Sequence, residues 1–396
     1  MASIVHRNNR FLVVHYEHDI SGKNKQKWET YRTLADAKRR KAEIEHRQEL
    51  GALDVPTCKT VNDLLKEYIS LYGKATWSLS VFSSNSRLIK NYISPIIGKM
   101  NLCEISPRIL EKYYQQLLKT PAVSHVTQKR GAKASSFVQP ATVRKIHSLL
   151  RSAFNQAVKW ELMEKNPAIH ATVPKAVSKK REVWDAETIF LALDVCDDAR
   201  LKLAINLSFA CSMRIGEILG LTWDCVDISP KSIADGTASI MIKKELQRVD
   251  KTAMKSLEQK DVLFIFPQSS KRNKTMLVLK KPKTESSIRK VFIPKTVARQ
   301  LEAWKREQER TKEALGYEYT DYNLVLAHGL GSPVEQSRIT AMFQALIKKN
   351  DLPKVVFHSL RHSSITYKLQ LTGGDIKSVQ GDSGHAQAQM VTDQYA

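Results

Sequence analysis

The sequence has few of the features that mark membrane or disulfide-bonded proteins. No hydrophobic run reaches the ~18 to 20 residues that a membrane-spanning helix needs, and no apolar segment near the start precedes a small-residue cleavage site. The five cysteines are odd in number and form no C-x-x-C pair, which argues against a disulfide framework and against a zinc ribbon. These absences predict a soluble cytoplasmic protein with reduced thiols and no membrane partner.

Nucleotide-binding motifs are missing as well. The sequence contains no P-loop and no G-x-G-x-x-G, and it has neither internal repeats nor sustained heptads. We therefore expect no ATP site, no cofactor and no bound metal.

What the sequence has in excess is positive charge. It holds 63 Lys and Arg against 40 Asp and Glu, a formal net charge of +23. Residues 57–180 alone hold 20 basic against 6 acidic residues, so more than half of the excess (+14) lies in this segment. Lysines that only keep a protein soluble would not be concentrated in this way. The distribution favours a polyanion as partner, and nucleic acid is the first candidate.

The length of 396 residues suggests two or three domains at roughly 100 to 200 residues each. Residues 1–52 combine alternating segments, "RFLVVHYEHD" and "KWETYRT", with a charged stretch of helical spacing, which predicts a small sheet packed on one helix. Either an arm-type DNA-binding domain or a solubilising accessory domain would give this pattern. A linker with Gly51 and Pro56 ends the region.

The remaining chain divides at a second, basic linker. Residues 57–175 contain four or so amphipathic segments separated by Gly, Pro or Ser and predict a helical domain. Residues 181–396 mix long apolar helices with a strand-rich stretch at about 238–293. The sequence thus predicts a multidomain, mainly α fold with small β elements, of the α+β class.

A basic loop and the helix that follows it carry the best candidates for DNA phosphate contacts. Point charges on a loop and a helix start can neutralise the DNA backbone without reading bases. Any one of these residues could instead be an ordinary solvated side chain, but the set as a whole favours DNA. The candidates are Lys129, Arg130, Lys133, Arg144 and Lys145.

Four features in the last region stand out, although each is weak alone. Arg214 interrupts the apolar pattern of "LSFACSMRIGEILGLTW" and can form an i,i+3 ion pair with Glu217 worth a few tenths of a kcal/mol. Lys283 enters a turn between two expected strands in "LKKPKTESSIRKVFIP". The segment "HSLRHSS" (358–364) places two imidazoles and a guanidinium on one helical face. The fourth, "SGHAQAQMVTDQYA" (383–396), holds a histidine ten residues before a tyrosine.

Taken in this order, the four features resemble the tyrosine recombinases, or phage-integrase family. That family has an arginine in a "GxR…E…L" helix, a lysine in a β-hairpin, "HxLRH", "GH" and a tyrosine nine to eleven residues later. The helical segment, notably "TVRKIHSLLRSAFNQAVKWELMEKNPA", is similar to the family's core-binding domain, and residues 1–52 and the insert 243–282 resemble those of integrases from conjugative transposons. One departure is that Cys211 and Ser212 stand where the family often has Thr-Gly.

The resemblance implies a site-specific recombinase that integrates and excises a mobile element through a 3′-phosphotyrosine intermediate. Its partners would be double-stranded DNA at the element ends and the target, and further copies of itself in a tetramer that passes through a Holliday junction. An excisionase and a host DNA-bending protein would join them in a bacterial nucleoid. The implied catalytic residues are Arg214, Lys283, His358, Arg361, His385 and Tyr395.

These residue types suit DNA cleavage without a metal. Attack on a phosphodiester adds negative charge to the non-bridging oxygens, which Arg214 and Arg361 can stabilise through paired N–H donors. His358 and His385 add hydrogen bonds, with one of the two as the acceptor of the tyrosyl proton. Lys283 can protonate the departing 5′ oxygen. The covalent link stores the bond energy for resealing.

The sequence also leaves other functions open. A type IB topoisomerase uses the same chemistry as a monomer, and a DNA-binding regulator with a decayed site would lack at least one of the groups. His358 and His362, at i and i+4, could form a zinc pair, but the H-E-x-x-H glutamate is absent and Arg361 would repel a cation. A metal-dependent transposase needs three clustered carboxylates, which the sequence does not single out.

Overall fold

The computed structural model describes residues 2–7, 9–18, 24–49, 58–123, 137–175, 182–268, 270, 272–376 and 379. The chain divides into two compact units, Met1–Gly73 with Asn85–Ala176, and Lys74–Ser84 with Val177–Ala396. Within the described residues, no helix is long and apolar enough to cross a membrane. The fold is mainly helical with small sheets, as the sequence predicts, and the described residues form three of them.

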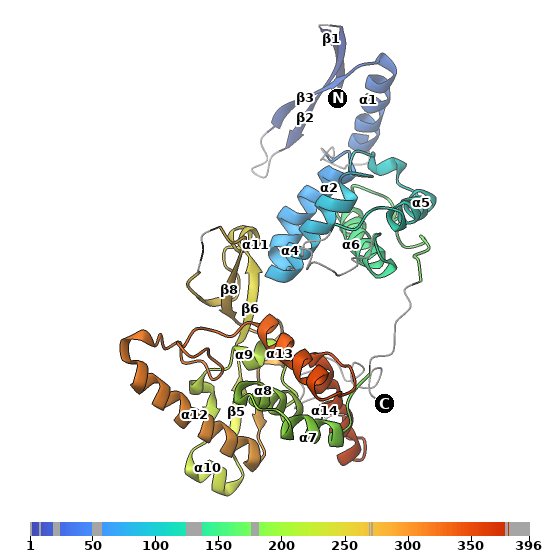
Figure 1. Cartoon of the computed structure of the whole chain (residues 1–396). Coiled ribbons are helices and arrows are strands. Elements are labelled where there is room, and N and C mark those ends of the chain that lie inside the picture. The colour runs from blue at the N-terminus through green and yellow to red at the C-terminus, as the bar shows by residue number, and fades with distance from the viewer. Residues whose placement is uncertain are drawn as a thin grey trace. The chain divides into compact units, whose positions relative to one another are not determined.

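A three-stranded antiparallel sheet and one helix form the start of the first unit (Figure 1). The strands are β1 (Ser3–Arg7), β2 (Arg10–His18) and β3 (Asn24–Tyr31), in the order β1-β2-β3, and the helix is α1 (Leu34–Glu49). Val13 of β2 packs against Ala37 and Ile44 of α1, and all three are fully buried. The alternation in "RFLVVHYEHD" thus places one sheet face against the helix.

The described residues from 58 to 159 are mainly helical. The helices are α2 (Val61–Glu67) continued by the π-helix η1 (Tyr68–Gly73), α3 (Lys74–Thr76), α4 (Leu79–Leu88) continued by the π-helix η2 (Ile89–Ile93), η3 (Leu102–Glu104), α5 (Pro107–Leu118) and α6 (Pro140–Lys159). The segment Lys74–Ser84, with α3 and the start of α4, is grouped with the second unit. Local sequence fixes two helix starts. Thr60 forms a capping box with Asp63 at α2, and Ser106 caps α5, where Pro107 occupies the first position.

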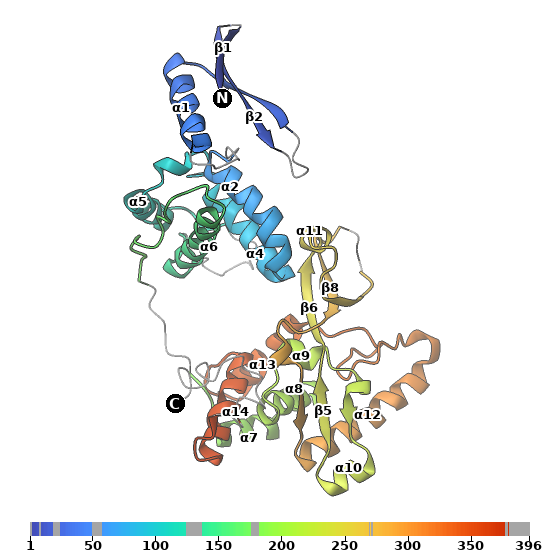
Figure 2. The same ribbon diagram turned by 180° about the vertical axis from the view of Figure 1, so that it is seen from behind.

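The second unit combines helices with two small sheets (Figures 1 and 2). Its helices are α7 (Ala186–Asp194), α8 (Ala199–Ala210), α9 (Ile215–Leu219), η4 (Trp223–Cys225), α10 (Pro230–Asp235), α11 (Lys251–Ser256), η5 (Glu285–Ser287), α12 (Lys295–Leu315), η6 (Gly316–Glu318), α13 (Gln336–Lys349) and α14 (Phe357–Leu371). Its strands are β4 (Val226–Asp227), β5 (Ser239–Ile242), β6 (Glu245–Asp250), β7 (Val262–Ile265), β8 (Thr275–Lys280) and β9 (Arg289–Phe292). The sheet of β6 and β8 projects from the helices, with α11 at its far end (Figures 1 and 2).

The two sheets are joined in one long antiparallel ribbon, with β5 and β6 on one side and β9 and β8 on the other. Strand β5 lies between β4 and β9, whereas β8 lies between β6 and β7, and all pairings are antiparallel. Ile242 pairs with Arg289 and Glu245 pairs with Lys280, so two residues on one side face eight (281–288) on the other. Those eight residues leave the ribbon as a loop. The insert 243–282 therefore supplies β6, α11, β7 and β8 and prolongs the ribbon.

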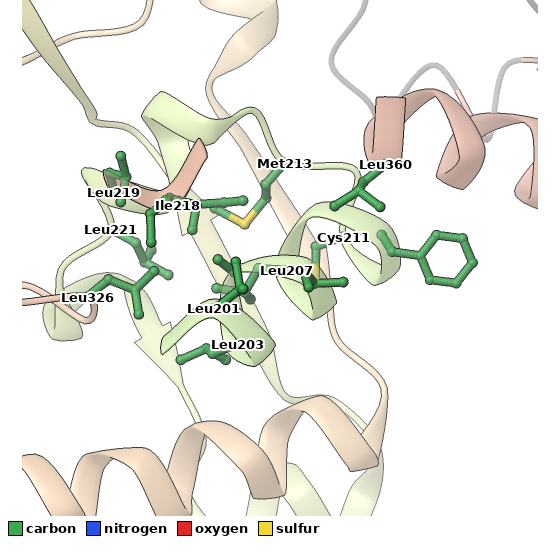
Figure 3. Packing of buried hydrophobic residues seen from close by; sticks show 14 of the residues in the cluster. Leu201, Leu203, Leu207, Cys211, Met213, Ile218, Leu219, Leu221, Leu326 and Leu360 are labelled. Atoms are coloured by element: carbon green, nitrogen blue, oxygen red, sulfur yellow. The ribbon is translucent and has the colours of Figure 1, made fainter. Parts of the chain in front are cut away.

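A large hydrophobic core of the second unit surrounds α8 (Figure 3). Leu207 of α8, Cys211 and Met213 in the following turn, and Leu360 of α14 meet there, each fully buried. The turn between α8 and α9 is therefore fixed by packing on the helix that carries "HSLRHSS". This packing brings segments about 150 residues apart in the sequence into contact.

Candidate active site

Arg214 begins helix α9 and is held by a carboxylate one turn further on. Its backbone N–H donates to Glu217 Oε2 at 3.0 Å, and its Nη1 donates to Glu217 Oε1 at 2.7 Å. The expected i,i+3 ion pair is therefore present. It is not a surface pair, however, because the Glu217 side chain is 1% exposed while that of Arg214 is 34% exposed. The pair fixes an accessible guanidinium on a buried anchor.

A second arginine shares this carboxylate. Arg289, at the start of β9, donates Nη2 to Glu217 Oε2 at 3.0 Å and Nη1 to Glu217 Oε1 at 3.3 Å. Burial alone would raise the pKa of the Glu217 carboxyl, but the guanidinium groups of Arg289 and Arg214 outweigh burial, so this pKa lies below its ordinary value. Glu217 is thus an ionised carboxylate between two guanidinium groups.

Arg361 connects helix α14 to the turn before Arg214. It is 2% exposed, and its Nη1 donates to the backbone carbonyl of Ser212. Ser212 has a left-handed backbone with φ of 51°, and its hydroxyl lies 2.6 Å from the hydroxyl of Ser364. A guanidinium and a hydroxyl of α14 therefore hold the residue two positions before Arg214. Two arginines named from the sequence meet at one turn.

Lys283 lies in the loop that leaves the ribbon, and its side chain is exposed. The expected strand, turn and second strand are present, with the short helix η5 in the turn. The expectation of a β-hairpin is wrong in one respect: β8 and β9 belong to different sheets, because each pairs with a different part of the β5–β6 strand. Lys283 is therefore carried by a lateral loop and not by a hairpin tip.

The loop is tied back to the arginine cluster. Arg289 Nη1 donates to the backbone carbonyl of Ser287 at 3.0 Å, and the hydroxyls of Ser287 and Thr284 lie 2.9 Å apart. Thr284 is the residue next to Lys283. A continuous series of contacts thus runs from Arg361 through the turn of Arg214 and Glu217 to the Lys283 loop. The structure brings these three sequence-predicted residues to one region.

Two histidines of "HSLRHSS" lie next to each other on α14. His358 is exposed on α14, and its ring lies 4.8 Å from that of His362, perpendicular to it. The helical reading of "HSLRHSS" is confirmed by α14. Among the residues with a described placement, no group of three or more His, Cys, Asp and Glu could hold a metal ion. His385 and Tyr395 lie outside the described residues.

Of the candidate phosphate contacts, Arg144 and Lys145 are exposed near the start of α6. Lys129, Arg130 and Lys133 lie outside the described residues. Sequence reasoning missed Arg151, which is exposed on the same helix seven residues after Arg144 and therefore on the same face. It also missed Arg289, whose partner Glu217 is 72 residues away in the chain. Helical spacing could have revealed Arg151 but not Arg289.

Two family models match the chain. The model of the phage integrase family covers residues 265–396, and that of the N-terminal SAM-like domain of phage integrases covers residues 60–118. A XerC-like tyrosine recombinase of Caldanaerobacter subterraneus is 25% identical over 347 residues, which are 85% of this chain and 78% of that relative. The ICEBs1 integrase of Bacillus subtilis is 23% identical over 316 residues, with coverage of 79% and 73%.

Solved structures of integrases share the fold. The integrase of the Tn1549 transposon, in complex with a circular intermediate DNA, aligns with a TM-score of 0.63 at 17% identity and covers 85% of this chain and 95% of its own. A lambda integrase tetramer bound to a Holliday junction aligns with a TM-score of 0.51 at 14% identity, over 99% of this chain and 94% of its own.

Proposed function

The chain belongs to the phage integrase family of tyrosine recombinases, and from this premise we propose that it cuts and rejoins DNA to integrate and excise a mobile element. The observation that carries the proposal is the series of contacts that joins Arg361, Arg214 and the Lys283 loop. Two guanidinium groups held at one turn, and an exposed lysine on a loop tied to that turn, suit a phosphodiester that is being cleaved, because arginines match phosphate geometry and a lysine can release a proton.

The proposed reaction is a transesterification. The Tyr395 phenol oxygen attacks the phosphorus, its proton passes to His358 or His385, and the bond from phosphorus to the 5′ oxygen breaks. Lys283 gives its proton to that oxygen, while Arg214 and Arg361 donate to the non-bridging oxygens. The product is a 3′-phosphotyrosine and a free 5′ hydroxyl. Attack by the 5′ hydroxyl of a second strand reverses these steps and releases the tyrosine.

DNA binding is assigned to all three regions: an arm-type domain at 1–52, a core-binding domain at 57–175 and a catalytic domain at 181–396. The exposed face of the N-terminal sheet supports the first assignment. One face packs on α1, whereas Val5, Tyr16 and Trp28 are exposed on the other, because Trp28 pairs with Val14 and side chains alternate along a strand. Sheets of this size can enter a DNA groove.

In the core-binding region, Arg144, Lys145 and Arg151 form an exposed basic surface on α6, and Lys129, Arg130 and Lys133 extend the set. We assign to them contacts with DNA phosphates, which position the protein without reading bases. The proposal includes a tetramer on DNA, which is supported by the likeness to a lambda integrase tetramer bound to a Holliday junction. A type IB topoisomerase would cleave as a monomer and exchange no strands.

A complementation experiment tests this function. Arg214→Lys and Tyr395→Phe are each expected to bind DNA and to leave a nicked suicide substrate uncleaved, because the first lacks the bidentate fork and the second lacks the nucleophile. If each copy uses its own tyrosine, a mixture of the two variants gives no product. Restored cleavage would mean that the tyrosine acts between subunits. Full activity of either variant alone would contradict the proposed chemistry.

A further inference from the structure

Arg289 is placed to act on two catalytic groups although it is itself buried. It is 7% exposed, and its forked guanidinium donates in two directions. One direction is to both oxygens of Glu217, at 3.0 and 3.3 Å, and the other is to the backbone carbonyl of Ser287, at 3.0 Å. A planar guanidinium with several fixed donors can hold both partners at once, which an ammonium group on a flexible chain cannot do in the same geometry.

The first partner controls Arg214. Glu217 is 1% exposed and accepts from the Nη1 and from the backbone N–H of Arg214. Both carboxylate oxygens are thus used by the two arginines together, so the rotamer of Glu217 depends on Arg289 as well as on Arg214. A change at Arg289 is therefore transmitted to the accessible guanidinium of Arg214.

The second partner controls the loop of Lys283. The Ser287 backbone N–H donates to the Thr284 carbonyl at 3.0 Å, and the two hydroxyls lie 2.9 Å apart. Lys283 directly precedes Thr284, and no ladder pairing holds residues 281–288 to the strand opposite. The Ser287 carbonyl is therefore an attachment point of this loop to the buried interior.

We propose that Arg289 is a positioning residue that sets Arg214 and Lys283 in register with each other, an inference that rests on the proposed function. Both groups have to reach the same phosphorus: Arg214 donates to its non-bridging oxygens, and Lys283 protonates the 5′ oxygen that leaves it. Charge stabilisation and proton transfer are useful only when they coincide in the transition state. One buried side chain with contacts to both supports provides that coincidence.

The test compares two substrates that differ at the leaving group. A nicked suicide DNA with an ordinary phosphodiester needs a proton on its 5′ oxygen, whereas one with a 5′-bridging phosphorothiolate releases a thiolate that needs none. Arg289→Lys keeps a positive charge beside Glu217 but loses the fork. We expect it to slow phosphodiester cleavage by about 10²-fold, which is the scale for a misplacement of about 1 Å. On the phosphorothiolate substrate, the loss of cleavage rate should be at least tenfold smaller.

A second variant leaves the buried ion pair of Arg289 and Glu217 unchanged. Thr284 is exposed, so Thr284→Val should fold normally while it loosens only the Lys283 loop. It should lose rate on the phosphodiester alone. The matched control is Arg248→Lys, because Arg248 of β6 also donates to a carboxylate, Glu335, at 2.9 Å, but the pair is about 40% exposed and outside these contacts. This control should cleave both substrates at the wild-type rate.

The outcomes separate this inference from the function on which it rests. If Lys283→Ala is itself not rescued by the phosphorothiolate, the role of Lys283 in the proposed function fails, and this inference fails with it. If Lys283→Ala is rescued but Arg289→Lys and Thr284→Val lose equally on both substrates, only the positioning role of Arg289 is overturned. The positioning role of Arg289 is supported if the phosphorothiolate restores cleavage by all three variants.

Discussion

Substitution of Gly220 by alanine tests how helix α9 is set against strand β6. The backbone of Gly220 has φ of −91°, which alanine adopts without strain, so the effect has to come from space alone. A β-carbon at this position would lie 2.6 Å from the Leu246 nitrogen and 2.7 Å from the Glu245 Cα. Non-bonded heavy atoms prefer about 3.5 Å or more, so the helix or the strand has to move by close to 1 Å.

Both stability and activity should respond to this movement. Overpacking of this kind costs about 1 to 3 kcal/mol, and each kcal/mol lowers the melting temperature of a unit of this size by about 2 to 4 °C. Helix α9 begins at Arg214, and β6 pairs with β8, which leads into the Lys283 loop. A misplacement of about 1 Å between such groups can lower the cleavage rate by roughly 10²-fold.

Gly216 provides the matched control on the same helix and against the same strand. A β-carbon there would lie 3.3 Å from the Leu246 carbonyl oxygen, and the gain in helix propensity, about 0.5 to 1 kcal/mol, offsets this mild contact. Calorimetry of the full chain, with hydrogen exchange of peptides from α9 and β6, measures both variants. Equal melting temperatures and cleavage rates of Gly220→Ala and Gly216→Ala would refute the predicted overlap at Gly220.

Three further predictions concern other parts of the molecule. Burial would raise the pKa of Glu29, but Arg40 and Lys59 lower this pKa to about 2. The ionised carboxylate therefore contributes fully to stability above about pH 4.5, and this contribution is lost as the pH falls towards 2. Glu29→Gln should flatten the acid limb of a curve of unfolding free energy against pH, and an unchanged acid limb would contradict the prediction. Deletion of residues 1–50 should abolish binding to a second, distal DNA sequence and leave binding to the core site intact. Each lost phosphate contact should reduce the slope of log K against log salt concentration by about 0.9. Loss of core-site binding would refute the domain assignment. Ser212→Gly and Ser212→Ala both lose the serine hydroxyl, but only alanine keeps the backbone strain of a left-handed conformation at φ of 51°. The glycine variant should therefore be more stable than the alanine variant by about 1 kcal/mol in urea unfolding. Equal stability of the two variants would show that the backbone of Ser212 is not strained.

Local patterns predicted the elements of the fold well. The 3.6-residue spacing of "HSLRHSS" corresponds to α14, and the alternation in the N-terminal segment corresponds to β2. Both follow from side-chain periodicity, which is a property of the segment itself. The strands around Lys283 were also predictable, but their partners were not. Pairing depends on the insert 243–282, because β8 pairs with β6 and β7 of this insert and β9 pairs with β5.

The candidate site was only partly predictable for the same reason. The pair of Arg214 and Glu217 follows from helical spacing and was expected to contribute a few tenths of a kcal/mol. Its carboxylate is in fact buried and shared with Arg289, because the ribbon brings β9 against α9 from 72 residues away. Burial and long-range pairing are properties of the packed molecule, and no local pattern in the sequence carries them.

The proposed chemistry requires that Tyr395 becomes covalently linked to DNA, which can be measured directly. The wild-type chain is incubated with a nicked suicide substrate, and the covalent adduct is digested and mapped by mass spectrometry. We predict that the 3′ phosphate is on Tyr395 and that Tyr395→Phe binds the same DNA without forming an adduct. Linkage to Tyr367, whose ring packs 5.6 Å from Phe209 in the core, or adduct formation by Tyr395→Phe at the wild-type rate, would contradict the account.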